Sequence, residues 1–450
     1  MPQKRKYYPA IIFVLSLAIT GGLFLSSCRY MDAVTDKTKE IVGDDLVDKA
    51  KEAIDKVKTY AYDSGAYDKL KQFERDIREK TVVKLPSSDE AVEITKNKIS
   101  EAIKTANELK TKFTSEYISS SSEEQVKEIE RTVTIDVSGK NSQSRFTLSR
   151  DLATADVDNI IIKAGNVEIG FTPQMLQKEF ERFGAIQIGI NNDGKNSVIT
   201  FEEENGNEVK FLNNVTVSIT VNNITNNSVI YNVQNDEKEL IGGKAEDGKL
   251  VFQTKEGGDY SVETNKVDYS DIGGEDSQTQ EAIGYLGSRG IFGIPGLIES
   301  LAFNPESTVI RADAVAMITK TLYKYDEDNK AYFSDVAEGD WYYTAVASGV
   351  AESIVVGYPD NTFRPDNAIS KQELLVVAAK TMISERKFIL PEDNRVYLGD
   401  FEEEIADWAK PYAAMCVRDG IIEQDKIDNG AGVINRAQAA LILYNLFIRL

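Results

Sequence analysis

The sequence contains no histidine, and this limits the chemistry available to it. Histidine is the usual general base at neutral pH and the commonest metal ligand. Its absence excludes Ser-His-Asp and Cys-His catalysis. An enzyme would have to rely on carboxylates, lysine or tyrosine, and we find no motif that frames such a site. We therefore expect no enzymatic activity, no catalytic residue, no bound metal and no cofactor.

The two cysteines have different surroundings. Cys416 lies in the apolar run 412–417, where a buried thiol behaves as a small hydrophobic side chain. Cys28 follows a segment with the three parts of a secretion signal, namely a basic start, an apolar run over about 10–25 and small residues before the cysteine. We predict a signal peptide over residues 1–27.

The sequence Leu25-Ser26-Ser27-Cys28 resembles the lipobox of bacterial lipoproteins. The resemblance implies that Cys28 is lipidated and becomes the new N-terminus, so that acyl chains attach the exported protein to the membrane. The alternative is a signal-anchor helix with an incidental cysteine.

The charge of the chain restricts its partners. The formal net charge is −21 over 450 residues, whereas a nucleic-acid-binding protein needs a basic surface to displace counterions. We expect no nucleic-acid partner.

Hydrophobic periodicity divides the chain into parts. Apolar residues recur every three or four positions within residues 28–130, which predicts a helical stalk or hairpin. From 131 to 264 the period is two, as at Val133, Ile135 and Val137, with turn signals such as Glu246-Asp247-Gly248-Lys249. This predicts a β-sandwich-like module.

Residues 266–450 contain three similar segments about 60 residues apart, at 266–326, 330–386 and 396–450. Ser370 with Glu373, and Asn435 with Gln438, have the spacing of a helix-capping box. Gly290 and Gly420 stand where a helix must end in a left-handed turn. Units this small cannot bury their own apolar faces, so the copies must pack together.

These segments are similar to the S-layer homology repeat. The middle copy matches best, through Phe333-Ser334-Asp335-Val336, Trp341 and the loop from Gly357 to Pro365. The resemblance implies a pseudo-threefold helical domain whose grooves bind secondary cell-wall polysaccharide, including pyruvylated forms, or a peptidoglycan-linked polymer. The expected fold class is a multidomain α+β protein with a helical stalk, a β-sandwich module and this helical domain.

The resemblance also implies the binding residues. The basic position of the family falls on Arg311, Lys371 and Arg436, where a cation at a helix start suits an anionic sugar substituent. For Arg311 and Arg436, packing against a neighbouring repeat is the alternative. Gly357 would let the backbone approach the ligand, while Trp341 and Trp408 either stack on sugar or fill the core. The remaining expected polymer contacts are Asp271, Asp335, Asp360, Arg364 and Asp400.

The middle copy has lysine in place of arginine at 371, the first has Ile310 at the capping position, and the third lacks the Phe-Arg-Pro loop. Together the features predict a non-catalytic surface lipoprotein that tethers the membrane to the wall or to an S-layer. An adhesin or solute-binding lipoprotein, with the β-module as its active part, is the alternative. A third reading, a carboxylate-based glycan hydrolase, requires paired acidic residues in one cleft.

Overall fold

The computed structural model describes residues 69–85, 92–118, 129–138, 143–192, 196–234, 237–292, 302–322, 325–386 and 390–450. Residues 69–450 form one compact unit. The expected signal peptide and the lipidation position Cys28 lie outside the described residues. Within the described ranges, we find no helix whose length and apolar character would suit a membrane crossing.

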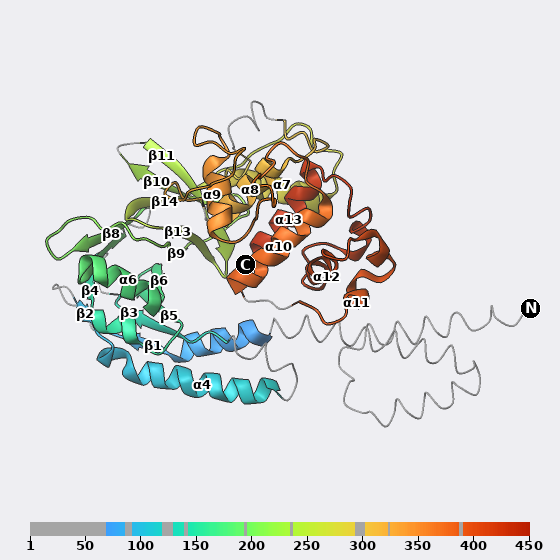
Figure 1. Ribbon diagram of the computed structural model, residues 1–450. Coiled ribbons are helices and arrows are strands. Elements are labelled where there is room, and N and C mark those ends of the chain that lie inside the picture. Colours follow the sequence, from blue (N-terminus) through green and yellow to red (C-terminus); the bar gives the residue numbers. More distant parts are fainter. Residues whose placement is uncertain are drawn as a thin grey trace, which may run out of the picture. The chain divides into compact units, whose positions relative to one another are not determined.

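The described strands form two seven-stranded sheets. The first sheet contains, in spatial order, β1 (Val82–Lys84), β3 (Thr132–Asp136), β5 (Asn159–Ala164), β6 (Val167–Phe171), β9 (Val215–Thr220), β13 (Lys249–Thr254) and β12 (Lys244–Glu246). The second contains β11 (Glu237–Gly242), β10 (Ser228–Gln234), β14 (Gly258–Thr264), β8 (Asn196–Glu203), β7 (Ile186–Asn192), β4 (Gln143–Leu148) and β2 (Val92–Ile94). Figure 1 shows these strands together with the short helix α6 (Pro173–Phe183).

The alternation of side chains explains why these segments are strands. Val215, Val217 and Ile219 of β9 are buried, and the residues between them are more exposed. The predicted Asp247-Gly248 turn joins β12 to β13, with Glu246 paired to Lys249. Asp247 and Gly248 both have positive φ, as a tight hairpin of this kind requires. The mixed composition of helices and two sheets agrees with the expected α+β class.

The segment expected to form a helical stalk or hairpin, residues 28–130, contributes a strand to each sheet. Residues 69–80 are helical, but β1 then pairs in parallel with β3, and β2 pairs in parallel with β4. The helix α4 (Ser100–Ile118) follows. The β-branched residues Val82, Val83, Val92 and Ile94 favour strands once a sheet edge is available. A helical period in the sequence carries no information about this pairing between distant segments.

The helix over residues 69–80 and α4 pack on the first sheet and on each other. Phe73 and Phe113 stack with their ring centroids 4.4 Å apart. The Thr81 hydroxyl donates to the Thr132 carbonyl of β3 at 2.6 Å. The Glu168 carboxylate of β6 is buried between Arg78 and the Lys249 ammonium, the latter at 2.8 Å. The described part of the expected stalk therefore belongs structurally with the strands.

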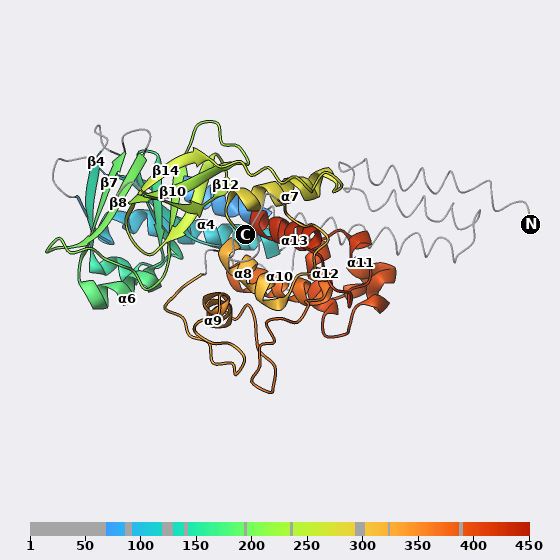
Figure 2. The ribbon, with the colours of Figure 1, turned by 90° about the horizontal axis from the view of Figure 1, so that it is seen from above.

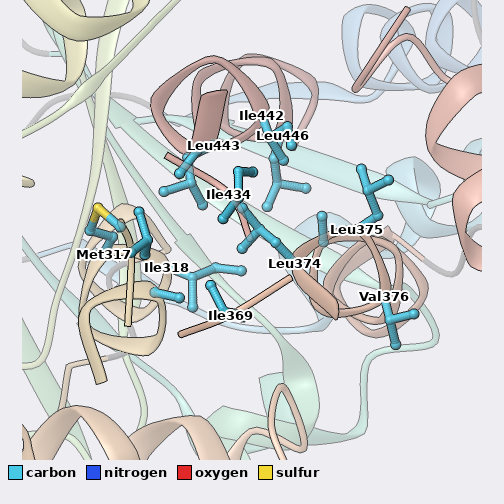
Figure 3. Packing of buried hydrophobic residues seen from close by; sticks show 14 of the residues in the cluster. Met317, Ile318, Ile369, Leu374, Leu375, Val376, Ile434, Ile442, Leu443 and Leu446 are labelled. Carbon is cyan, nitrogen blue, oxygen red and sulfur yellow. The ribbon is translucent and has the colours of Figure 1, made fainter. Parts of the chain in front are cut away.

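The C-terminal part of the chain is helical. Its main helices are α7 (Ser277–Ser288), α8 (Arg311–Thr321), α9 (Tyr343–Ala351), α10 (Lys371–Arg386), α11 (Asn394–Leu398), α12 (Lys410–Arg418) and α13 (Arg436–Arg449). Figure 3 shows Ile318, Leu374 and Leu443, from α8, α10 and α13, meeting in one apolar cluster. Cys416 is also buried there, and burial raises the pKa of its thiol.

The residues that precede α8, α10 and α13 form a closed ring of backbone hydrogen bonds. The N–H of Val309 donates to Ile434, that of Ile434 to Ile369, and that of Ile369 to Val309, at 3.0–3.1 Å. Each helix start is thus bound to the other two in the same sense. The ring relates three segments of the chain cyclically.

Candidate functional site

The three basic residues expected to bind ligand occupy the first position of α8, α10 and α13. Each donates to a backbone carbonyl in the loop of another segment. These bonds join Arg311 Nε to Phe363 O at 3.0 Å, Lys371 Nζ to Asp428 O at 2.8 Å, and Arg436 Nε to Phe303 O at 2.9 Å. The polar ends of these side chains therefore hold neighbouring loops in place.

The predicted capping boxes are present at two of these helix starts. Ser370 donates to the Glu373 carboxylate and its hydroxyl accepts from the Glu373 N–H. Asn435 and Gln438 exchange the equivalent bonds. At α8 the capping residue is Ile310, which has no side-chain oxygen to accept a bond. Its N–H reaches the Asp313 carboxylate only at 3.5 Å.

The junction between α13 and α8 differs chemically from the junction between α8 and α10. Arg311 lies 3.7 Å from the Glu373 carboxylate. Asp313, which is one methylene shorter, occupies the matching position near Arg436, and among the described residues these two side chains form no ion pair. The Arg436 side chain is buried, its Nη2 has no hydrogen-bond partner in the described part of the chain, and its guanidinium carbon lies 4.7 Å from the Phe303 ring centroid. Burial lowers the pKa of Arg436 and raises the pKa of Asp313.

Aspartates fix two of the loops that the basic residues contact. The Asp335 carboxylate accepts from the N–H groups of Phe363 and Arg364, both at 2.7 Å. Asp271 accepts in the same way from Phe303 and Asn304. Burial opposes ionisation of Asp271, but these hydrogen bonds outweigh it and hold its pKa below the usual value.

Glu404 fixes the third loop, and Asp400 does not. Asp400 is exposed in a 3₁₀ turn spanning Gly399–Glu404. Glu404 accepts from the Asn429 N–H at 2.5 Å instead. Asp400 was expected to contact the polymer because it is the aspartate near the start of the third segment. The acidic residue four positions later was missed because no local pattern identifies it.

The loop of the middle segment presents an exposed charged and aromatic group. Arg364 Nη2 pairs with the Asp360 carboxylate at 2.9 Å, and its guanidinium carbon lies 3.8 Å from the Tyr358 ring centroid. The Arg364 side chain is 42% exposed. Hydrogen bonds from Thr362 and Arg364 lower the pKa of Asp360 to about 2. The aromatic member, Tyr358, was not among the expected binding residues.

The remaining expected residues have mixed surroundings. A Cβ added at Gly357 would lie 2.1 Å from the Phe333 ring, so the close approach at this glycine is to a neighbouring aromatic side chain. Trp341 and Trp408 are 37% and 53% exposed. The two tryptophans are therefore available at the surface, although Trp341 also contacts the Tyr342 ring edge-on.

Comparison with known proteins identifies one part of this region. Residues 332–375 match the S-layer homology domain. These residues include the Phe333–Val336 motif, the exposed loop and the start of α10. An S-layer homology domain is thus present in the middle segment.

Three relatives share longer parts of the chain. An amylopullulanase of Thermoanaerobacterium thermosulfurigenes is 27% identical over 340 residues, which cover 68% of this chain and 17% of the relative. Exoglucanase XynX of Acetivibrio thermocellus is 32% identical over 205 residues, which cover 44% of this chain and 18% of the relative. A cellulosome-anchoring protein of A. thermocellus is 27% identical over 147 residues, which cover 31% of this chain and 32% of the relative. The chain spans less than a fifth of the first two relatives and about a third of the other.

The relatives overturn the expectation that the chain is not an enzyme. Two of them carry the names of enzymes, an amylopullulanase and an exoglucanase. Absence of histidine does not exclude glycan hydrolysis, because two suitably placed carboxylates suffice for it. The domain and the anchoring relative support cell-wall attachment and indicate an exported protein of the cell surface.

Proposed function

We propose that residues 266–450 comprise three S-layer homology repeats, 266–326, 330–386 and 396–450, which bind secondary cell-wall polysaccharide or a peptidoglycan-linked polymer. The match over residues 332–375 carries this proposal. The cyclic hydrogen bonds among Val309, Ile369 and Ile434 support it, since they relate all three segments in the same way.

The exposed loop of the middle segment is the proposed centre of polymer contact. Arg364 offers a solvent-accessible guanidinium that can pair with a carboxylate such as a pyruvate substituent. Tyr358, together with the exposed Trp341 and Trp408, offers aromatic surface for sugar rings. In this proposal Arg311, Lys371 and Arg436 act mainly by positioning the loops, together with Asp271 and Asp335.

The second attachment in the proposal is a lipid on Cys28, after removal of residues 1–27. The basic, apolar and small residues that precede this cysteine support it. Lipid at one end and polymer at the other would tether the membrane to the wall. Cells expressing Cys28→Ser are expected to incorporate no labelled fatty acid into this protein, and unchanged labelling would contradict lipidation at this position.

Wall binding is tested with the full exported chain and purified wall sacculi. The protein is expected to sediment with sacculi and to be released when pyruvate is removed from the wall polymer. Failure to sediment with any wall preparation would contradict polymer binding. Sedimentation that ignores pyruvate removal would contradict recognition of the anionic group while leaving polymer binding supported.

Glycan hydrolysis is a second candidate function, favoured by the amylopullulanase and exoglucanase relatives. The purified chain would then release reducing sugar from starch, xylan, cellulose or wall glycan. Release that survives repeated purification and is lost on heat unfolding would support hydrolysis. Release at the rate of a buffer control on all four substrates would contradict it.

A further inference from the structure

A buried arginine joins the strands to the first helical segment. Arg289 ends α7, is 4% exposed and has its guanidinium carbon 3.3 Å from the Tyr285 ring centroid. Its Nε donates to the Gly243 carbonyl at 2.6 Å, and its Nη1 donates to the Asn226 carbonyl at 2.7 Å. Its Nη2 donates to the Ser228 carbonyl at 3.3 Å. All three carbonyls belong to the strand-bearing part of the chain.

The position of these carbonyls makes the contact specific. Gly242 and Gly243 carry the chain from β11 in one sheet to β12 in the other, and both have positive φ. A Cβ added at Gly242 would come within 3.4 Å of Arg289. The planar guanidinium matches several backbone acceptors at once, which an ammonium group on a flexible stem does less well.

Further contacts surround Arg289. The Asn265 side chain donates to the Ser288 carbonyl at 2.5 Å, and the Ala245 N–H donates to the Tyr285 hydroxyl at 3.3 Å. Lys255 pairs with Asp326 at 2.5 Å, so the strands also contact the chain beyond α8. Figure 2 shows α7 beside β12 on one side and α13 on the other.

We infer that the strand-bearing part, residues 129–264, is a docking partner without which the first helical segment is incomplete, and that Arg289 is the residue that locks the two together. The helical region is then not an independent module attached by a linker at residue 265. The match to the amylopullulanase supports this inference, because 68% of the chain is more than residues 266–450 can supply. The shared region must therefore include part of the strands.

The test separates chain connection from docking. A specific protease site is inserted in the full chain between Lys266, whose side chain is exposed, and Val267, so that Tyr269 and Asp271 stay with the helical piece that they contact. After cleavage, the two pieces of the otherwise unchanged protein are expected to elute together in size-exclusion chromatography. Pieces that separate at micromolar concentration would overturn the inference.

The role of Arg289 in holding the two parts together is tested in the same cleaved protein. Arg289→Met is expected to raise the dissociation constant of the two pieces at least roughly tenfold, because it removes charge-assisted hydrogen bonds that nothing replaces. Arg395→Met, at an exposed arginine of α11, is the matched control and should leave the constant unchanged. Equal constants for Arg289→Met and the control would overturn the role of Arg289.

Loss of a buried arginine can also prevent folding, so a milder variant accompanies it. Asn265→Ala removes the 2.5 Å contact to the Ser288 carbonyl and leaves Arg289 in place. It is expected to weaken association of the cleaved pieces severalfold. Unchanged association in this variant would count against docking through this surface.

Discussion

Arg364 occupies a backbone conformation that arginine rarely adopts. Its φ is 60°, and the matching residues of the other two loops, Asn304 and Asn429, have φ values of 56° and 49°. Asparagine enters this left-handed region more easily than other residues with a Cβ. The middle loop thus keeps an arginine where asparagine would be less strained. This choice is understandable if the guanidinium has a role outside the fold.

Replacing Arg364 with asparagine should separate stability from binding. Arg364→Asn relieves backbone strain but loses an exposed ion pair and the contact with the Tyr358 ring, so we expect the free energy of unfolding to change by less than about 1 kcal/mol. Sedimentation with wall sacculi should fall at the same time. Denaturant unfolding and the sacculus assay measure the two effects.

Arg395→Asn, at an exposed arginine outside the loop, is the control for loss of charge. A variant at 364 that binds sacculi as strongly as this control would remove Arg364 from the proposed contact surface.

At the scale of elements, the loops are held to the helices by charged side chains with backbone partners. Asp271 binds two N–H groups of the loop that Arg436 also contacts. Asp271→Asn keeps the shape of the side chain but places an NH₂ group opposite a backbone N–H. We therefore expect the free energy of unfolding to fall by about 1–3 kcal/mol at pH 7.

The loss at position 271 should depend on pH. The folded pKa of Asp271 lies below its ordinary value of 3.8. The carboxylate therefore adds stability that is present above pH 3.8 and disappears as the pH falls through the folded pKa. The difference between wild type and Asp271→Asn should narrow in that range, as measured by denaturant unfolding. Asp400→Asn, at an exposed position of the third segment, is the control for removal of a carboxylate and should leave the free energy of unfolding at pH 7 close to wild type.

Sequence patterns predicted the features that depend on near neighbours. The Ser370–Glu373 box, the Asp247-Gly248 turn and the left-handed glycines at 290 and 420 were all expected from spacings of a few residues. Each requires only that a short stretch of chain meets its own backbone. For the same reason these local features do not depend on which distant segments pack against them.

Features that depend on distant partners were not predicted. β1 pairs in parallel with β3, and β2 pairs in parallel with β4, and in both pairs the partner lies more than 50 residues further along the chain. Burial of Lys371 requires a carbonyl at Asp428, and the contact of Glu404 requires the N–H of Asn429. No helical or strand period contains this information, because it arises only when separate segments meet.

At the scale of the whole molecule, the ring through Val309, Ile369 and Ile434 makes the three helical segments interdependent. Deleting residues 433–450 removes one donor and one acceptor of the ring, the Arg436 contact and the apolar face of α13. We expect this truncated chain to lose wall binding entirely and to lose cooperative unfolding of the helical part, as followed by circular dichroism.

A point change in the same helix provides the comparison. Ile448 is exposed on α13, so Ile448→Ser should leave both folding and binding close to wild type. If the truncated chain sedimented with sacculi as well as Ile448→Ser does, the middle segment would be sufficient alone and the interdependence would be wrong.

The ring also sets an order of events during secretion. A polypeptide leaves the ribosome and the export channel N-terminal end first, and Val309 and Ile369 emerge before Ile434, whose peptide group completes the circle. While α13 is still inside the export channel, the ring of backbone hydrogen bonds among Val309, Ile369 and Ile434 is therefore still open. If the proposed wall binding needs the closed ring, a molecule that stops partway through export would not bind the wall polymer.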